Sequence, residues 1–270
     1  MEKRVRFGEY WKPLLIWVAL LALAQLLGAV ISLLLDKMIG NPDYSDASSL
    51  FGYVAMIALP ILFCVIFKKR QLLPEMGFGG KRAVLFYLCG AFIGVITCVA
   101  CITASARLNG VSFQQDSVVI PLLVVYAVAY CVQGMGEEVL YRGFLLHMLP
   151  NDKGMLVPVL ISAACFSVSH AVNTDAGILS LINIFLIGVF LGLLMVTWNS
   201  IWLVGGFHAL YNLAQTNIVD ASGSTVSGAA LYRFPSGYAF NVEGCWLTTV
   251  LFAILAAVIY VYARKKGCIA

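Results

Sequence analysis

Long apolar runs recur along this chain and are separated by short polar segments. A membrane-spanning helix needs about 20 predominantly apolar residues, so each run has the length of one crossing. The pattern predicts an all-α, polytopic membrane helix bundle of about eight transmembrane helices. We expect these helices at 12–35, 48–67, 83–105, 119–147, 155–173, 176–198, 200–219 and 244–263.

The composition agrees with a bundle that is solvated by lipid. Hydrophobic residues make up 61% of the chain and charged residues 11%, and the mean hydropathy is +0.94. A soluble domain is about 45–50% apolar and about 25% charged. No internal repeat is evident, which argues against a transporter built from inverted repeats. We therefore treat 1–270 as a single membrane domain whose partners include membrane lipids.

The basic residues indicate the orientation of the bundle. If the N-terminus is inside, all of the 17 Lys and Arg residues except Lys37, Arg107 and Arg233 fall in cytoplasmic segments. The positive-inside rule therefore places both termini in the cytoplasm. The net charge of +4 then reflects orientation and gives no support for a nucleic-acid partner.

Other features of the chain allow more than one interpretation. Cys98 and Cys101 have the spacing of redox and metal sites, but free cysteines in an apolar helix more often pack as small hydrophobic residues. The external loop 220–243 is rich in Gly and Ser and acts either as a lid or as a connector. The absence of an Asn-x-Ser/Thr acceptor fits a multi-pass protein of a bacterial plasma membrane.

Two adjacent glutamates, Glu137 and Glu138, interrupt the fourth apolar run. An ionisable side chain in the bilayer costs about 2.5–3.5 kcal/mol on insertion scales, so an intramembrane pair indicates a functional site. Residues four apart share a helix face, which pairs Glu138 with Arg142. Glu137 has no cation within a turn and is the candidate general base. The competing interpretation is a structural ion pair plus one glutamate that reaches the cytoplasmic edge.

The histidines supply the next candidates. His170 closes a Phe-x-x-x-His pattern, His208 opens His-x-x-x-Asn with Asn212, and His147 lies at a predicted cytoplasmic helix end. A bundle should bury imidazole and amide groups only against partners. At about 1.5 Å per residue, Glu137 and His208 have similar depths and His170 lies about 8–10 Å deeper. We expect His170, His208 and Asn212 to meet at Glu137.

The three patterns together resemble a known signature. Glu-Glu-x-x-x-Arg, Phe-x-x-x-His and His-x-x-x-Asn, in this order over roughly 119–215, are similar to the motifs of the CPBP family. That family comprises the type II CaaX prenyl endopeptidases and the bacterial bacteriocin-processing and self-immunity proteins, also called Abi proteins. The resemblance implies an eight-helix intramembrane endopeptidase whose cavity opens toward the cytoplasm.

The resemblance also implies roles for individual residues. Glu137 and His170 would activate water, and His208 and Asn212 would stabilise the oxyanion. Glu138 and Arg142 would support the geometry of the site. The implied substrate is a membrane-associated or lipidated peptide or protein, and nothing in the sequence shows that it is prenylated.

A metal is an open question at this point. Two histidines and a glutamate, His170, His208 and Glu137, have the composition of a catalytic zinc site with water in the fourth position. The His-Glu-x-x-His helix of many zinc metalloproteases is absent, however. A metal-free, glutamate-dependent mechanism is an equal candidate. Two further alternatives are a noncatalytic bacteriocin self-immunity or peptide-binding protein, and a proton-coupled transporter that uses Glu137.

Overall fold

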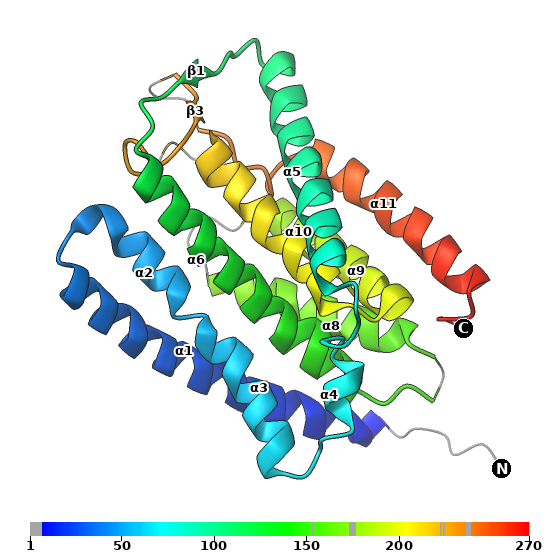
Figure 1. The fold of residues 1–270 in the computed structure, drawn as a ribbon. Helices are drawn as coiled ribbons and strands as arrows, with labels where there is room; N and C mark the ends of the chain where they lie inside the picture. The colour runs from blue at the N-terminus through cyan, green and yellow to red at the C-terminus, as the bar shows by residue number, and fades with distance from the viewer. Residues whose placement is uncertain are drawn as a thin grey trace.

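The computed structural model describes residues 7–152, 154–172, 177–221, 223, 225–235 and 239–269. Figure 1 shows long helices that run beside one another, and the predicted all-α membrane bundle is confirmed. The helices are α1 Trp11–Ile39, α2 Ser45–Phe51, α3 Val54–Ile66, α4 Leu72–Glu75, α5 Ala83–Leu108, α6 Ile120–Glu138, α7 Leu146–Met148, α8 Leu156–Ser169, α9 Ile178–Trp198, α10 Ile201–Leu213 and α11 Trp246–Lys265.

Each predicted span corresponds to a helical stretch, but the stretches differ in length. Within the described ranges, six are long and apolar enough to cross a membrane: Trp11–Ile39, Pro42–Ile66, Ala83–Leu108, Ile120–Met148, Ile178–Trp198 and Trp246–Lys265. The other two are shorter, with 14 residues in α8 and 13 in α10. Helix α8 is followed by a 3-10 turn, His170–Val172, and α10 by a π-helical segment, Ala214–Ile218.

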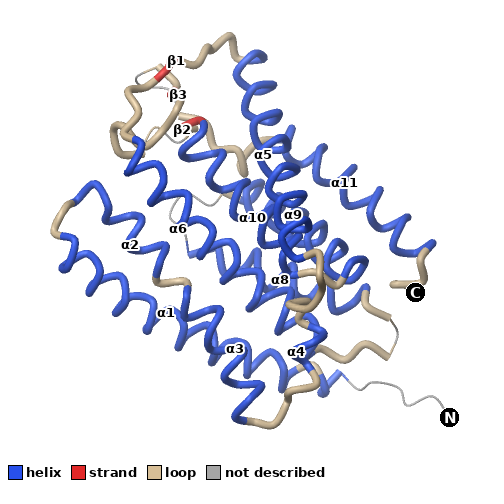
Figure 2. The backbone as a smooth tube through the Cα atoms, in the orientation of Figure 1, coloured by secondary structure: helices blue, strands red, loops and turns tan. Residues whose placement is uncertain are grey.

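Three short strands join the loops at the end of the bundle where α6 begins (Figure 2). They are β1 Gln114–Gln115, β2 Val219–Asp220 and β3 Tyr232–Arg233. Strand β3 lies in the middle, antiparallel to β1 and parallel to β2. The 220–243 loop thus ties itself to the loop before α6. The start of α1 and the end of α11 both lie away from this sheet (Figure 1).

Close packing brings α10 against α6 and α5. A Cβ atom placed on Gly134 of α6 would lie 2.5 Å from the backbone nitrogen of Ala209, and one on Gly206 of α10 would lie 2.3 Å from the carbonyl oxygen of Tyr87. Only glycine permits such approaches, as is common where membrane helices meet. The contact at Gly134 holds the helix that carries His208 beside the helix that carries Glu137.

The remaining apolar side chains divide between the interior and the outer surface. Leu26, Leu33 and Met38 of α1 are strongly exposed, as expected for a helix that faces lipid. Cys98 and Cys101 are free thiols buried on α5, in keeping with a packing role.

Candidate active site

The two glutamates lie where the fourth span changes its helical geometry. Helix α6 ends at Glu138 and continues as a π-helical segment, Val139–Leu145, before α7. Such segments occur frequently at functional sites. Glu137 is 4% exposed, and Glu138 and Arg142 are fully buried. A glutamate that reaches the membrane edge would be exposed, so the burial of Glu137 contradicts that interpretation.

Glu138 forms the predicted ion pair within its own helix. The Nη1 atom of Arg142 donates to Oε1 of Glu138 at 2.8 Å. The guanidinium carbon of Arg142 also lies 4.2 Å from the centre of the Phe166 ring. Phe166 is the first residue of the Phe-x-x-x-His pattern. The ion pair therefore joins the first two motifs in space.

His208 contacts both glutamates. Its Nδ1 atom lies 2.7 Å from Oε1 of Glu138, and its Nε2 atom lies 3.5 Å from Oε2 of Glu137. The sequence analysis paired Glu138 with Arg142, and the contact with His208 is a second role for the same carboxylate. A carboxylate accepts but does not donate when ionised, so Nδ1 carries the proton in this contact. The Nε2 atom then faces Glu137.

Asn212 reaches Glu137 through a residue that the sequence analysis missed. The Nδ2 atom of Asn212 donates to Oε1 of Gln133 at 3.0 Å, and Nε2 of Gln133 donates to Oε1 of Glu137 at 3.2 Å. Gln133 lies four residues before Glu137, and this spacing was the available signal. In the described part of the chain, Oε2 of Glu137 is buried and has no hydrogen-bond partner.

His170 lies at the end of α8, where its Nδ1 atom is 2.8 Å from the carbonyl oxygen of Phe166. It lines a cavity of about 30 Å³ together with His208, Asn212 and Glu243. A water molecule needs at least about 10–15 Å³ of such space, so the cavity has room for a water. No direct hydrogen bond or ion pair joins His170 to Glu137 among the residues that the structure describes. His208 is the group that lies between the cavity and Glu137.

Glu243 is the second cavity residue that the sequence analysis missed. It lies in the segment before α11, at the edge of a loop rich in Gly and Ser, and no motif marks it. His147, by contrast, lies in the last turn of its span, where Nδ1 is 2.9 Å from the carbonyl oxygen of Gly143. As expected, His147 lies outside the group of side chains around Glu137 and His208.

The described side chains do not form a three-ligand metal site. No group of three or more His, Cys, Asp or Glu residues within them is arranged to hold a metal ion. Catalytic zinc sites need three protein ligands. The candidate set of Glu137, His170 and His208 therefore does not fit zinc in this arrangement.

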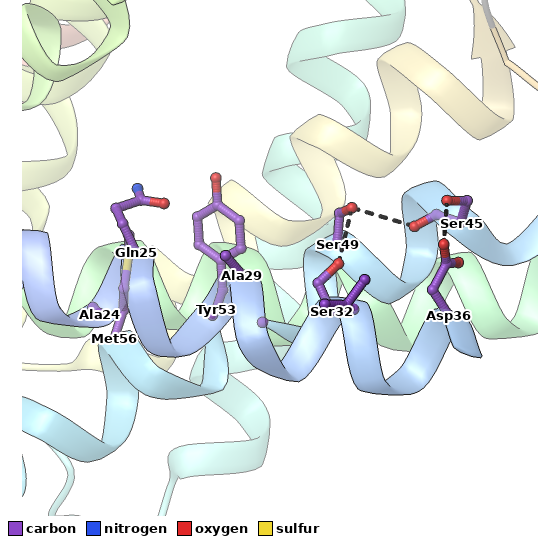
Figure 3. Close-up of a pocket in the computed structure, with 12 residues that line it drawn as sticks. Ala24, Gln25, Ala29, Ser32, Asp36, Ser45, Ser49, Tyr53 and Met56 are labelled. Carbon is purple, nitrogen blue, oxygen red and sulfur yellow. Dashed lines mark hydrogen bonds between the residues drawn. The ribbon is translucent and has the colours of Figure 1, made fainter. Parts of the chain in front are cut away.

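A polar groove of about 490 Å³ lies between α1 and the α2–α3 pair (Figure 3). The hydroxyl of Ser49 meets that of Ser32 at 3.2 Å, and Ser45 donates to Asp36 at 3.1 Å. The groove also reaches Tyr53, whose carbonyl oxygen would be 2.6 Å from a Cβ on Gly136. One part of the groove wall thus packs beside the turn that carries Glu137. The groove residues are Ala24, Gln25, Gly28, Ala29, Ser32, Leu33, Asp36, Ser45, Ser49, Gly52, Tyr53 and Met56.

Comparison with known families identifies the segment that carries these residues. Residues 119–214 match the family model described as type II CAAX prenyl endopeptidase Rce1-like. This segment belongs to the CAAX protease family. The Rce1-like segment runs from the start of α6 to the end of α10 and contains all three motifs. The match indicates a CAAX-type intramembrane protease in a multi-pass membrane protein. No curated protein sequence matches the chain.

Proposed function

We propose that this protein is a glutamate-dependent intramembrane endopeptidase. It hydrolyses a peptide bond in a membrane-associated or lipidated peptide or protein. The observation that carries the proposal is the position of Glu137. Its carboxylate is buried, one oxygen has no hydrogen-bond partner among the described residues, and that oxygen faces Nε2 of His208 at 3.5 Å.

Glu137 and His170 activate the attacking water in this proposal. The cavity beside His170 and His208 has room for a water. Oε2 of Glu137 accepts no hydrogen bond from the described residues, and it takes one proton as the water oxygen attacks the scissile carbonyl. Gln133 holds the other oxygen of Glu137 at 3.2 Å, which fixes the direction of the carboxylate. A positioned base of this kind contributes about 10²–10⁴-fold to a rate.

His208 and Asn212 stabilise the oxyanion that forms on the scissile carbonyl. The Nδ1 proton of His208 is held by Glu138, so Nε2 is the ring atom that donates to substrate when it is protonated. Asn212 uses one N–H on Gln133 and keeps a second for the oxyanion. Loss of one such donor costs about 10²–10³-fold in turnover. Glu138 and Arg142 hold His208 in place.

The polar groove between α1 and the α2–α3 pair supports the proposal that the substrate is a peptide. Backbone amide groups within a bilayer need hydrogen-bond partners. The groove offers hydroxyl and carboxylate side chains along its length and packs beside Gly136 at Tyr53. We further propose a bacterial plasma membrane location with both termini cytoplasmic, which accessibility labelling of tags at the two ends would test.

A cleavage assay tests the proposed function. The purified protein is incubated with a farnesylated peptide that ends in a CAAX motif, and with the same peptide without the lipid. The wild type should release the C-terminal tripeptide, and Glu137→Gln should not. Glu75→Gln is the matched control, because Glu75 is exposed on α4. If Glu137→Gln cleaved at the wild-type rate, a noncatalytic peptide-binding or bacteriocin self-immunity role would replace the protease.

A further inference from the structure

Glu243 brings a carboxyl group to the cavity that His170 and His208 line. It lines the same space of about 30 Å³ as His170, His208 and Asn212. It comes from the segment before α11, which lies outside the Rce1-like match of residues 119–214. Neither the motifs nor the match therefore assigns it a role.

Buried side chains fix the segment that carries Glu243. The Nδ2 atom of Asn183, on α9, donates to the carbonyl oxygens of Glu243 at 2.6 Å and Cys245 at 2.9 Å. Thr248 donates to the carbonyl oxygen of Val242 at 2.6 Å. Asn183 and Thr248 are both fully buried. These three hydrogen bonds hold the backbone of the segment against the bundle.

The surroundings of Glu243 favour its protonated form. Burial raises the pKa of the Glu243 carboxyl above its usual range, and the nearby carboxylate of Glu137 raises it further. Positive charge on His170 or His208 acts in the opposite direction, and the net shift is upward. The phenol of Tyr211 lines the cavity as well. The raised pKa lets the Glu243 carboxyl keep its proton to a higher pH than an exposed glutamate does, as a proton donor must.

Amide hydrolysis needs two proton transfers, and the site described so far provides for one. Glu137 takes a proton from water, but the amine that leaves must gain one. His208 and Asn212 are committed to the oxyanion, and His170 to the water. Glu243 is the carboxyl group that lines the cavity and has no role in these steps.

We propose that Glu243 is a further catalytic residue, which contacts the substrate and protonates the leaving nitrogen. This inference rests on the proposed function. An O–H bond of water breaks and its proton goes to Glu137, while the water oxygen bonds to the scissile carbon. The C–N bond then breaks, its electron pair stays on nitrogen, and nitrogen takes the Glu243 proton. The proton held by Glu137 returns to Glu243, so one water yields one acid and one amine.

A change of leaving group tests this assignment. A thiolate departs without a proton, so a thioester at the scissile bond does not need a general acid. The farnesylated CAAX peptide and its matched thioester are each given to wild type, Glu243→Gln, Glu137→Gln and the exposed control Glu75→Gln. Glu243→Gln should lower kcat for the amide by about 100-fold or more and leave the thioester rate near wild type. Glu137→Gln should slow both substrates.

Three outcomes would count against the assignment. The first is wild-type amide cleavage by Glu243→Gln. The second is an equal loss on both substrates by a variant whose thermal unfolding matches wild type. The third is a Tyr211→Phe variant that loses cleavage of the amide but not of the thioester, while Glu243→Gln loses neither. That result would make the Tyr211 phenol the proton donor. A folded wild type that cleaves neither substrate would instead overturn the proposed function itself, and the inference with it.

Discussion

The Nδ1 atom of His208 and the Oε1 atom of Glu138 lie 2.7 Å apart, although 70 residues separate them in the chain. The same oxygen accepts the hydrogen bond from Arg142 at 2.8 Å. Glu138 therefore neutralises a buried cation and also sets the tautomer of an imidazole that faces Glu137. In the proposed mechanism, stability and catalysis depend on different contacts of this one carboxylate, and paired variants can separate the two effects.

Glu138→Gln should reduce both stability and turnover. Breaking one side of a buried ion pair costs about 3–5 kcal/mol, because Arg142 is left without its counter-charge. Replacing Glu138 and Arg142 together by leucine should recover much of the stability, as apolar substitutes for buried pairs often do. The double variant should stay inactive because His208 loses its acceptor. Thermal unfolding and the cleavage assay measure the two effects, and an active double variant would limit Glu138 to a structural role.

Gln133→Leu should lower turnover by about tenfold, which corresponds to about 1.4 kcal/mol. The change removes the hydrogen-bond donor to Glu137 and the acceptor for Asn212. The side chains of Glu137 and Asn212 are then no longer held in one orientation. The rate should fall mainly in kcat, because neither contact binds substrate in the ground state. Gln71→Leu is a suitable control, since Gln71 is exposed. Equal rates for wild type and Gln133→Leu would show that the link is unimportant.

Gly134→Ala should loosen the contact between α6 and α10. The added Cβ would lie 2.5 Å from the backbone nitrogen of Ala209, which cannot move independently of its helix. Overpacking of this kind costs about 1–3 kcal/mol, and the displaced helix would carry His208 away from Glu137. Gly79→Ala, which has open space around it, should behave as wild type. Unfolding temperatures of the two variants in the same detergent provide the comparison.

Acid should release the small sheet before the rest of the bundle. Burial alone would raise the pKa of Asp116, but its hydrogen bonds to Arg233 and the Ser117 amide lower it overall. A group whose folded pKa is depressed stabilises the folded state above its unfolded pKa of about 3.9 and loses this contribution as the pH falls through the folded value. The protection of the β1 and β3 amides, measured relative to their intrinsic exchange rates at each pH, should therefore fall below about pH 4. Asp116→Asn should show low protection in both strands, and this protection should no longer change across the same pH range.

Chelation should leave cleavage unchanged. In the described residues, Glu137, His170 and His208 do not form a three-ligand site. Protein verified as metal-free by elemental analysis should therefore turn over at the wild-type rate, and added zinc should not increase it. Loss of activity on chelation, restored by zinc, would mean that these side chains rearrange around a metal.

The contacts that the sequence predicted are those that helical spacing determines. The Glu138–Arg142 pair lies within one helix four residues apart, and the structure contains it. The segments that form helices were also predicted, because lipid imposes a length of about 20 apolar residues on each crossing. The short α8 was not expected at 14 residues, since its predicted range also includes the 3-10 turn that follows.

The missed contacts depend on how separate helices are rotated and tilted against each other. The face of α10 that His208 occupies relative to Glu138 follows from glycine contacts such as the one at Gly134. Periodicity does not contain this information. Glu243 was missed because a loop segment has no periodicity, and Asn183 holds it through main-chain atoms that any residue supplies.

The π-helical segment Val139–Leu145 determines how the end of the fourth span is rotated about its axis relative to the beginning. Each α-helical residue advances by about 100°, so one residue more or fewer turns everything beyond it by that angle. The π-helical turns are wider than α-helical turns. They let Arg142 and Glu137 both face the interior, although the two residues lie in parts of the span that are rotated relative to each other. A deletion of one residue in this segment would turn α7 by about 100° relative to α6.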